Sequence, residues 1–352
     1  MSRFWSDVTA RLKPYVPGEQ PVEGSFLKLN TNESPYPPSP NVNSAVSDFS
    51  ISNLSLYPDP DSRMLVDALS ERFNLSNENI FVGNGSDEVL AHIFVGLLRQ
   101  GRPLRFPDIS YGFYSVWAEL FDIKTTLIPL RQDFSINVED YLDTDAPIII
   151  ANPNAPTSLA LELDDIERLA SGNPDSVVVI DEAYIDYGGE SALPLVEKYE
   201  NILVVQTFSK SRALAGTRVG YALGHPALIQ GLRRVKDSFN SYPVDSFSQA
   251  TAVASLSDED YFRKCCDRIC SSRESLIEGL DNLGFEVLPS KTNFVFASHP
   301  DISGAELYGE LYKRKILVRY WDTPRLQNHV RITVGSENQC RQLLSELGKI
   351  VL

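Results

Sequence analysis

The chain has 352 residues, too many for one ordinary domain, and its 43% hydrophobic content supports a sizeable core. A formal net charge of −15 argues against binding to nucleic acid or to an anionic membrane. No apolar run approaches the roughly 18 residues of a membrane helix, and residues 1–7 lead into no signal-peptide core, so we expect a cytoplasmic protein. The four cysteines and four histidines lack ligand spacing, so neither a disulfide framework nor a metal site is expected.

Three regions follow one another along the chain. Residues 1–38 are rich in proline and turn-forming residues, and they predict an arm that joins the smaller domain and wraps a partner subunit. Alternating helical and strand patterns over 39–245 predict a large α/β domain with a mainly parallel sheet. Residues 246–352 contain a long helical region and then short strands near 293–296, 316–318 and 330–334, which predict a smaller α+β domain.

A glycine-containing turn over residues 83–88, Gly-Asn-Gly-Ser-Asp-Glu, precedes an apolar pattern of helical period. Its backbone N–H groups would open the N-terminus of that helix toward an anion. An ordinary capped helix explains Ser86 and Asp87 equally well. The turn is therefore a candidate anion site that needs support from elsewhere in the chain.

Two apolar strand patterns, over 177–180 and 202–205, each end in polar residues. Asp181 and Tyr184 follow the first, and Lys210 follows the second about one βα unit later. Parallel strands deliver their carboxyl ends to one edge of a sheet, where ligands bind in open α/β folds. Either fragment alone is usually a solvated loop, but the combination predicts one pocket.

These residue types suit a pyridoxal phosphate site. A lysine such as Lys210 forms a Schiff base with the cofactor aldehyde and, once displaced, moves the Cα proton of the substrate. A carboxylate such as Asp181 keeps the pyridine nitrogen protonated, and Tyr184 is placed to bind the ring 3′ oxygen. The side chains expected to hold the cofactor phosphate are Thr207, Ser209 and Arg218. We therefore interpret Lys210, Asp181 and Tyr184 as catalytic.

In this order and spacing the residues resemble the fold-type I aminotransferases, and within them the histidinol-phosphate aminotransferase family, over nearly the whole chain. The resemblance implies a homodimer that binds pyridoxal 5′-phosphate. It also implies amino-group transfer between L-histidinol phosphate and 2-oxoglutarate in histidine biosynthesis. Aromatic or broad-specificity aminotransferases share the scaffold and remain alternatives, followed by a threonine-phosphate decarboxylase and a non-catalytic cofactor-binding regulator.

The same resemblance implies further site residues. Tyr57, in Tyr-Pro-Asp-Pro, matches the tyrosine that reaches the cofactor phosphate of the neighbouring subunit. Tyr111 matches the aromatic residue that stacks on the cofactor ring. The turn at 83–88 would contribute Gly85, Ser86 and Asp87 to cofactor binding. The residues that match the substrate pocket are Arg331, Arg319, Tyr15 and Asn32.

One segment departs from the family pattern. The family reads Asn-Pro-Asn-Asn-Pro-Thr-Gly where this chain has Asn-Pro-Asn-Ala-Pro-Thr-Ser over 152–158. Ala155 cannot supply the usual hydrogen bond to the ring 3′ oxygen, so either Asn154 or Tyr184 with a water must supply it. One such bond is worth about 0.5 to 1.5 kcal/mol, which would tune the cofactor without abolishing its binding. Ser158 in place of glycine predicts a turn that needs no positive φ.

Overall fold

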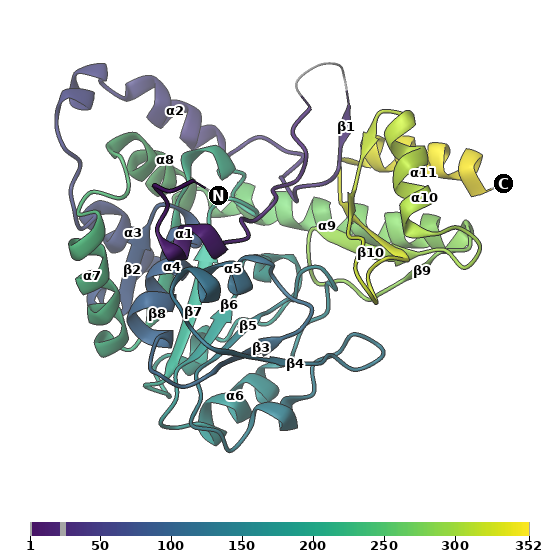
Figure 1. The fold of residues 1–352 in the computed structure, drawn as a ribbon. Helices are drawn as coiled ribbons and strands as arrows, with labels where there is room; N and C mark the ends of the chain where they lie inside the picture. Colours follow the sequence, from purple (N-terminus) through teal and green to yellow (C-terminus); the bar gives the residue numbers. More distant parts are fainter. Residues whose placement is uncertain (1, 22–25, 352) are drawn as a thin grey trace.

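The central sheet has seven strands, in the order β2-β8-β7-β6-β5-β3-β4, and forms the larger part of the molecule (Figure 1). The computed structural model describes residues 2–21 and 26–351. The strands are β2 Ile80–Gly83, β3 Leu104–Pro107, β4 Thr125–Ile128, β5 Ile148–Ala151, β6 Val178–Asp181, β7 Ile202–Thr207 and β8 Gly220–Gly224. Only β8 runs against the others, so the mainly parallel sheet is confirmed.

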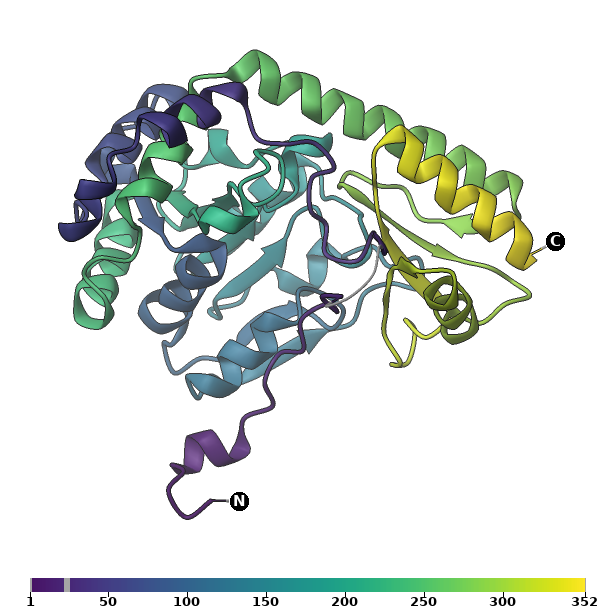
Figure 2. The same ribbon diagram turned by 90° about the horizontal axis from the view of Figure 1, so that it is seen from above.

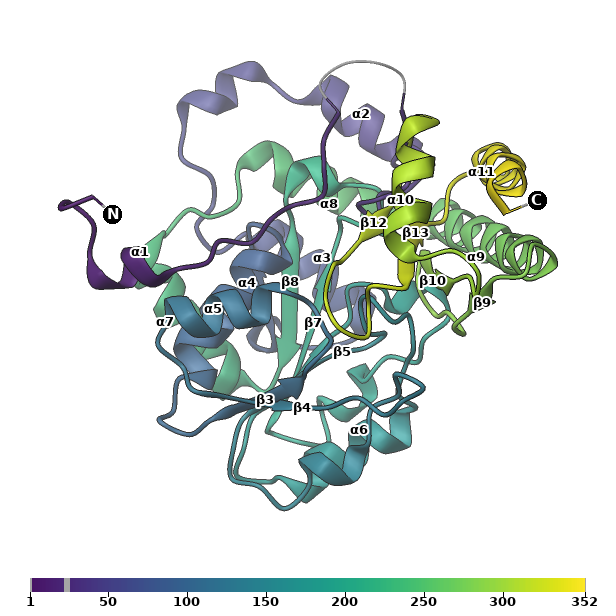
Figure 3. The same cartoon turned by 45° about the vertical axis from the view of Figure 1, so that its right-hand side comes forward.

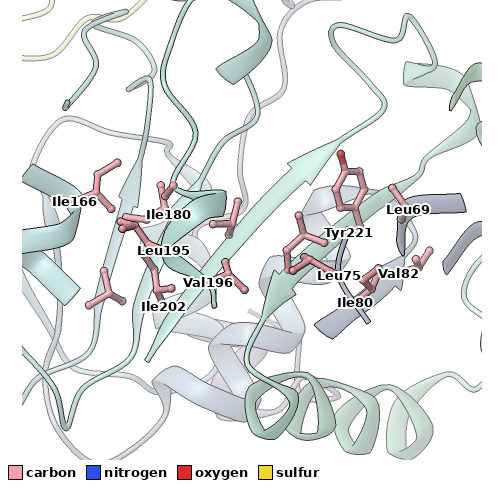
Figure 4. Close-up of a cluster of buried hydrophobic side chains, with 14 of the residues drawn as sticks. Leu69, Leu75, Ile80, Val82, Ile166, Ile180, Leu195, Val196, Ile202 and Tyr221 are labelled. Atoms are coloured by element: carbon pink, nitrogen blue, oxygen red, sulfur yellow. The ribbon is translucent and has the colours of Figure 1, made fainter. Parts of the chain in front are cut away.

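Helices cover both faces of this sheet, and for this reason its inner strands are apolar at nearly every position. Along β5, Ile148 and Ile150 enter the core on one face, whereas Ile149 enters the core on the other. The first face is covered by α2 Pro40–Asp48, α3 Arg63–Phe73, α6 Leu163–Gly172 and α8 Ser246–Leu256. The second is covered by α4 Gly85–Ile93, α5 Phe113–Leu120 and α7 Pro226–Phe239. Figure 4 shows part of the first core, including Ile166 and Ile180.

The smaller domain is built on an antiparallel sheet in the order β12-β13-β10-β9. Its strands are β9 Glu286–Val287, β10 Phe294–Ser298, β12 Arg319–Tyr320 and β13 His329–Thr333. Its helices are α9 Glu259–Asn282, α10 Gly304–Lys313 and α11 Glu337–Val351. Viewed from above, α9 and α11 lie side by side (Figure 2). Apolar side chains of α9, α10 and α11 pack on the sheet and close a separate core.

The arm belongs partly to the smaller domain, because β1 Leu27–Lys28 pairs in parallel with β11 Ile316–Leu317. At its start, α1 Asp7–Arg11 stands away from the body of the molecule (Figure 3). Helix α8 packs on α2 and α3 and contributes Ala252 to the core of the large domain. We therefore propose that the domain boundary lies near the start of α9 and not at residue 245. Among the described residues, no helix is long and apolar enough to cross a membrane.

Ser158 has a φ of +66°, so the prediction of a turn without positive φ is wrong. The backbone N–H of Ser158 donates to Asn154 O, and its hydroxyl donates to Pro289 O at 3.0 Å. These bonds hold the residue in a conformation that glycine adopts more readily. The serine thus keeps the turn and adds a link to the smaller domain.

Candidate active site

A cavity of about 670 Å³ opens at the carboxyl ends of β5, β6 and β7, between the two domains and the arm. This is the sheet edge at which the sequence predicts a site. The predicted residues that line it are Tyr15, Asn32, Ser86, Asp87, Tyr111, Asp181, Tyr184, Thr207, Ser209, Lys210, Arg218, Arg319 and Arg331. Gly85 lies next to the lining at the start of α4, whereas Asn154 and Tyr57 lie outside it.

Asp181 ends β6 with its carboxylate buried at the base of the cavity. Tyr114 donates its hydroxyl to Oδ2 at 2.8 Å, and the N–H of Ala183 donates to Oδ1 at 3.3 Å. Burial raises the pKa of Asp181 to about 6, although both hydrogen bonds oppose that shift. A neighbouring cation stabilises the ionised form of a buried carboxylate strongly, and a protonated pyridine nitrogen would be such a cation.

Lys210 lies in the loop after β7 and projects toward the arm. Its Nζ donates to Thr31 O at 3.2 Å and lies 5.7 Å from the ring centre of Tyr184. The hydroxyl oxygen of Tyr184 accepts a hydrogen bond from Asn32 Nδ2 at 2.9 Å. The arm thus contacts both Lys210, which follows β7, and Tyr184, which follows the neighbouring strand β6. Its hydrogen bonds hold the Lys210 amine and the Tyr184 phenol close together.

The start of α4 and Arg218 together form an anion-binding turn. A Cβ on Gly85, whose φ is +82°, would lie 2.6 Å from Nη2 of Arg218. A Cβ on Gly220 would lie 2.3 Å from the backbone N of Ser86. Only glycine at these two positions lets β8 and the guanidinium approach the helix N-terminus so closely. The helix N–H groups and the guanidinium suit a phosphate at this place.

Hydrogen bonds and an ion pair hold the side chains around this turn in place. Arg218 donates to Ser209 Oγ at 3.2 Å and pairs with Asp87 at 3.3 Å. Tyr111 donates its hydroxyl to Asp87 at 2.8 Å, which fixes its ring against the cavity. Its ring also meets Tyr114 edge-on, at 5.6 Å between centroids. Tyr111 lies just before α5 and Tyr114 in its first turn, where the Tyr114 N–H donates to Tyr111 O at 3.1 Å.

The two arginines differ in what they already bind. Arg319 on β12 donates to Val16 O at 2.9 Å and to Pro17 O at 3.2 Å, so it holds the arm. Arg331 on β13 donates from Nη2 to Asn30 O at 3.0 Å, and its Nε has no partner among the described residues. Burial lowers the pKa of Arg331. Trp321 lies between them, with its ring centre 5.4 Å from the Arg319 guanidinium and 5.3 Å from that of Arg331.

The amide of Asn154 is fully engaged in joining two loops. Its Nδ2 donates to Ile109 O at 3.0 Å and to Thr157 Oγ1 at 2.9 Å, and its Oδ1 accepts from Ser110 at 2.9 Å. Ala155 lines the cavity instead. The geometry therefore favours Tyr184 as the partner of the ring 3′ oxygen. Trp321 and Tyr114 were not predicted, since no local sequence pattern marks either of them as a site residue.

Tyr57 lies away from this cavity and is 82% exposed. Its ring stacks on Tyr242 at 4.7 Å. The segment that follows Tyr57 is held by side chains of α7 and α8. Lys236 donates to Pro60 O at 2.9 Å, and Gln249 donates to Asp59 O at 3.2 Å. An exposed aromatic side chain on an anchored segment suits contact with another molecule.

A second cavity of about 320 Å³ lies near Arg72, Asp186 and Arg212. Its charged side chains are already engaged, since Arg212 pairs with Glu259 at 3.0 Å and Asp186 accepts a hydrogen bond from Ser211 at 2.5 Å. The larger cavity, by contrast, combines a lysine, a buried carboxylate, an anion-binding turn and a partly unpaired arginine. That set fits the ring nitrogen and phosphate of pyridoxal phosphate. Over residues 2–21 and 26–351, no group of His, Cys, Asp and Glu is arranged to hold a metal ion.

Comparison with known proteins gives a consistent picture. The model of aminotransferase class I and II matches residues 25–347. Histidinol-phosphate aminotransferase 2 of Dechloromonas aromatica is 52% identical over 99% of both chains. Histidinol-phosphate aminotransferase of Acinetobacter baylyi is 53% identical over 98% of this chain and 96% of its own. The crystal structure of histidinol-phosphate aminotransferase from Sinorhizobium meliloti in complex with pyridoxal-5′-phosphate has a TM-score of 0.89, at 24% identity over 100% of this chain and 98% of that one.

Proposed function

The chain belongs to the class I and II aminotransferases, and among them to the histidinol-phosphate aminotransferases, and from this premise we propose how its residues carry out the reaction. The activity is pyridoxal phosphate-dependent transfer of an amino group between L-histidinol phosphate and 2-oxoglutarate, a step of histidine biosynthesis. One observation carries the assignment of residues. Lys210, Asp181 and Arg331 line one cavity, and they supply a base, a buried anion and an anion-binding cation.

Bound pyridoxal phosphate supplies an electrophilic carbon and a ring that accepts electrons from the substrate Cα. Asp181 would hold the ring nitrogen protonated, and that cation would oppose the effect that burial has on the pKa of Asp181. Ser86 at the helix N-terminus, with Ser209 and Arg218 beside it, would bind the phosphate. Tyr111 would provide an aromatic face for the ring, and Thr207 lines the same cavity.

Proton transfer falls to Lys210. Its Nζ, when it carries no covalent bond to the cofactor, would act as the base that takes the proton from the substrate Cα and then as the acid that gives it back during the transfer. Tyr184 would donate a hydrogen bond from its hydroxyl to the ring 3′ oxygen, since Asn32 already donates to the hydroxyl oxygen. This arrangement leaves the phenol proton directed away from Asn32. Tyr184 takes over the contact that Ala155 cannot make.

Substrate anions bind at Arg331. Its free Nε and its planar fork suit the phosphate of histidinol phosphate in one half-reaction and a carboxylate of glutamate in the other. Tyr15, on the arm, stacks on Phe113 at 4.3 Å and covers the same side of the cavity. Arg319 holds the arm in that position through its bonds to Val16 and Pro17.

We place the enzyme in the cytoplasm as a homodimer. All four cysteines are free, as is usual in a reducing compartment. Exposed Tyr57 and the outstretched α1 support contact with a second copy, in which Tyr57 would reach the partner's cofactor phosphate.

A substrate panel tests the proposal. The purified, cofactor-loaded enzyme is assayed with 2-oxoglutarate against L-histidinol phosphate, phenylalanine, tyrosine and threonine phosphate. We expect kcat/KM to be highest for L-histidinol phosphate. A higher value for phenylalanine or tyrosine would assign the enzyme to aromatic substrates, and release of carbon dioxide from threonine phosphate would assign it to the decarboxylases.

A further inference from the structure

Residues 321–326, between β12 and β13, form the outer wall of the cavity and are tied to the large domain by Arg325. The Nη2 of Arg325 donates to Arg131 O at 2.5 Å, and its Nη1 lies 3.4 Å from Asp108 Oδ2. Its guanidinium also lies 5.1 Å from the ring centre of Phe134. All three partners belong to the large domain, so one side chain of the smaller domain bridges the mouth of the pocket.

The backbone at both ends of this bridge is strained. Arg325 has a φ of +68° and Phe134 a φ of +65°, a region that glycine adopts freely and other residues adopt at a cost. Phe134 closes a tight turn, in which its N–H donates to Arg131 O. Figure 1 shows this loop after β4 extending toward the smaller domain.

An apolar contact accompanies the polar one. Phe134 meets Phe296 edge-on at 5.8 Å, and buried Leu326 joins the same cluster with Ile109 and Leu130. The cluster therefore contains side chains from both domains. Together with Arg325 it forms what we call the clasp, which consists of residues 131–134 and 325–326 with Asp108 and Phe296.

Trp321 begins the segment that the clasp holds, and its ring lies between Arg319 and Arg331. A shift of the segment would therefore move the ring against which Arg331 rests. We propose that Arg325 is a positioning residue for substrate binding. By fastening the outer wall to the large domain, it keeps Trp321, and through it Arg331, at the distance from Lys210 that the substrate anion requires. This role rests on the proposed function.

The test compares three variants in the cofactor-loaded enzyme. Arg325→Gly removes the side chain and relieves the backbone strain, whereas Arg325→Lys keeps the charge and a long side chain. Lys315→Gly is the matched control, because Lys315 lies in the same domain with a φ of +61° and does not line the cavity. For each variant, kcat and KM are measured for L-histidinol phosphate with 2-oxoglutarate as the amino acceptor, and for glutamate with imidazole acetol phosphate as the acceptor. Hydrogen exchange of residues 131–135 and 321–326 is followed by mass spectrometry.

We expect Arg325→Gly to raise KM for both substrates about tenfold while kcat changes less than threefold, because binding and not chemistry is disturbed. Exchange should accelerate in both segments, one from each domain. Arg325→Lys should restore KM in part, and Lys315→Gly should leave the kinetic constants and the exchange of both segments unchanged. If Arg325→Gly does not fold, Arg325→Lys still tests the proposal, because this variant too should show a raised KM and faster exchange in both segments.

Several outcomes would overturn the inference. Unchanged exchange would show that Arg325 does not join the domains, and faster exchange with unchanged KM would reduce the clasp to a structural role. An equal rise in KM for Lys315→Gly would reveal general destabilisation. Failure of the proposed function is distinguishable, since the wild-type enzyme would then not use L-histidinol phosphate while the exchange measurement would still report on the clasp.

Discussion

Asn32 donates a hydrogen bond from Nδ2 to the hydroxyl oxygen of Tyr184 at 2.9 Å, and so joins the arm to the residues that follow β6. Asn32 is itself held from the smaller domain, because Thr333 Oγ1 donates to Asn32 Oδ1 at 3.0 Å. The orientation of the phenol beside Lys210 therefore depends on three segments that are far apart in the sequence.

Asn32→Gly tests this link without straining the backbone, since Asn32 has a φ of +58°. The variant loses two neutral hydrogen bonds, and loss of the one to Tyr184 should lower kcat by roughly twofold to tenfold, corresponding to about 0.5 to 1.5 kcal/mol. Asn74→Gly is the control, because Asn74 has a φ of +54° and lies exposed at the end of α3. Equal turnover in wild type and Asn32→Gly would show that Tyr184 needs no such support.

Lys210→Ala should abolish turnover while the protein still binds pyridoxal phosphate through the phosphate site and Asp181. Borohydride reduction should attach the cofactor to the wild-type peptide that contains Lys210, as peptide mass spectrometry would detect. Lys198→Ala, at an exposed lysine that pairs with Glu167, should leave both results unchanged. Transamination at a normal rate by Lys210→Ala would refute the assignment of the base.

Asp181 should make the cofactor-free protein less stable as the pH rises. Its pKa in the folded chain is about 6, above the ordinary value of 3.8, so the folded state binds the extra proton. The free energy of unfolding should therefore decline between about pH 4 and pH 6, by on the order of 3 kcal/mol. Glu182, whose pKa burial raises to about 7, extends the decline toward neutral pH.

Asp181→Asn removes the titrating group and keeps an oxygen for the Tyr114 hydroxyl. The variant should match the wild type at pH 4 and exceed it in stability at pH 8, as measured by urea unfolding of the cofactor-free proteins. Glu337→Gln, at a carboxylate whose side chain is 76% exposed, serves as the control. An unaltered pH slope in Asp181→Asn would show that Asp181 does not carry the effect.

The sequence predicts the sheet edge and its strand-end residues because these depend on local pattern. Asp181 and Lys210 each follow an apolar strand, and parallel pairing alone brings their ends together. The hydrogen bonds from Arg319 to the carbonyls of Val16 and Pro17 were not predictable. Those residues are about 300 positions away in the sequence, and only the folded arm brings them close. The αL conformation of Ser158 was missed for a similar reason, because part of what holds it is a contact with Pro289.

Arg331 and Arg319 should respond differently to removal. Arg331→Ala should lower kcat/KM for L-histidinol phosphate by an amount equivalent to roughly 2 to 5 kcal/mol, the range for breaking a buried charge pair. Arg319→Ala should mainly release the arm, which limited proteolysis near residues 15–19 would detect, with a smaller loss in kcat/KM. Equal kinetic losses without a change in proteolysis would indicate that both arginines bind the substrate directly.

The exposed ring of Tyr57 gives the sharpest test of a shared active site. Tyr57→Ala and Lys210→Ala chains should each be weakly active or inactive alone, because one would lack the phosphate contact and the other the base. When the two are unfolded, mixed and refolded together, hybrid dimers should contain one site with both residues intact. Activity should then recover to as much as about a quarter of the wild-type value, since random pairing makes half the dimers hybrids with one working site each.

Met64→Ala, at a residue that is 69% exposed, replaces Tyr57→Ala in the control mixture with Lys210→Ala chains. Its own sites remain intact in every dimer, so its activity should show no gain on mixing. Absence of recovery in the Tyr57 mixture, or a fully active monomer in solution scattering, would show that each chain completes its own site.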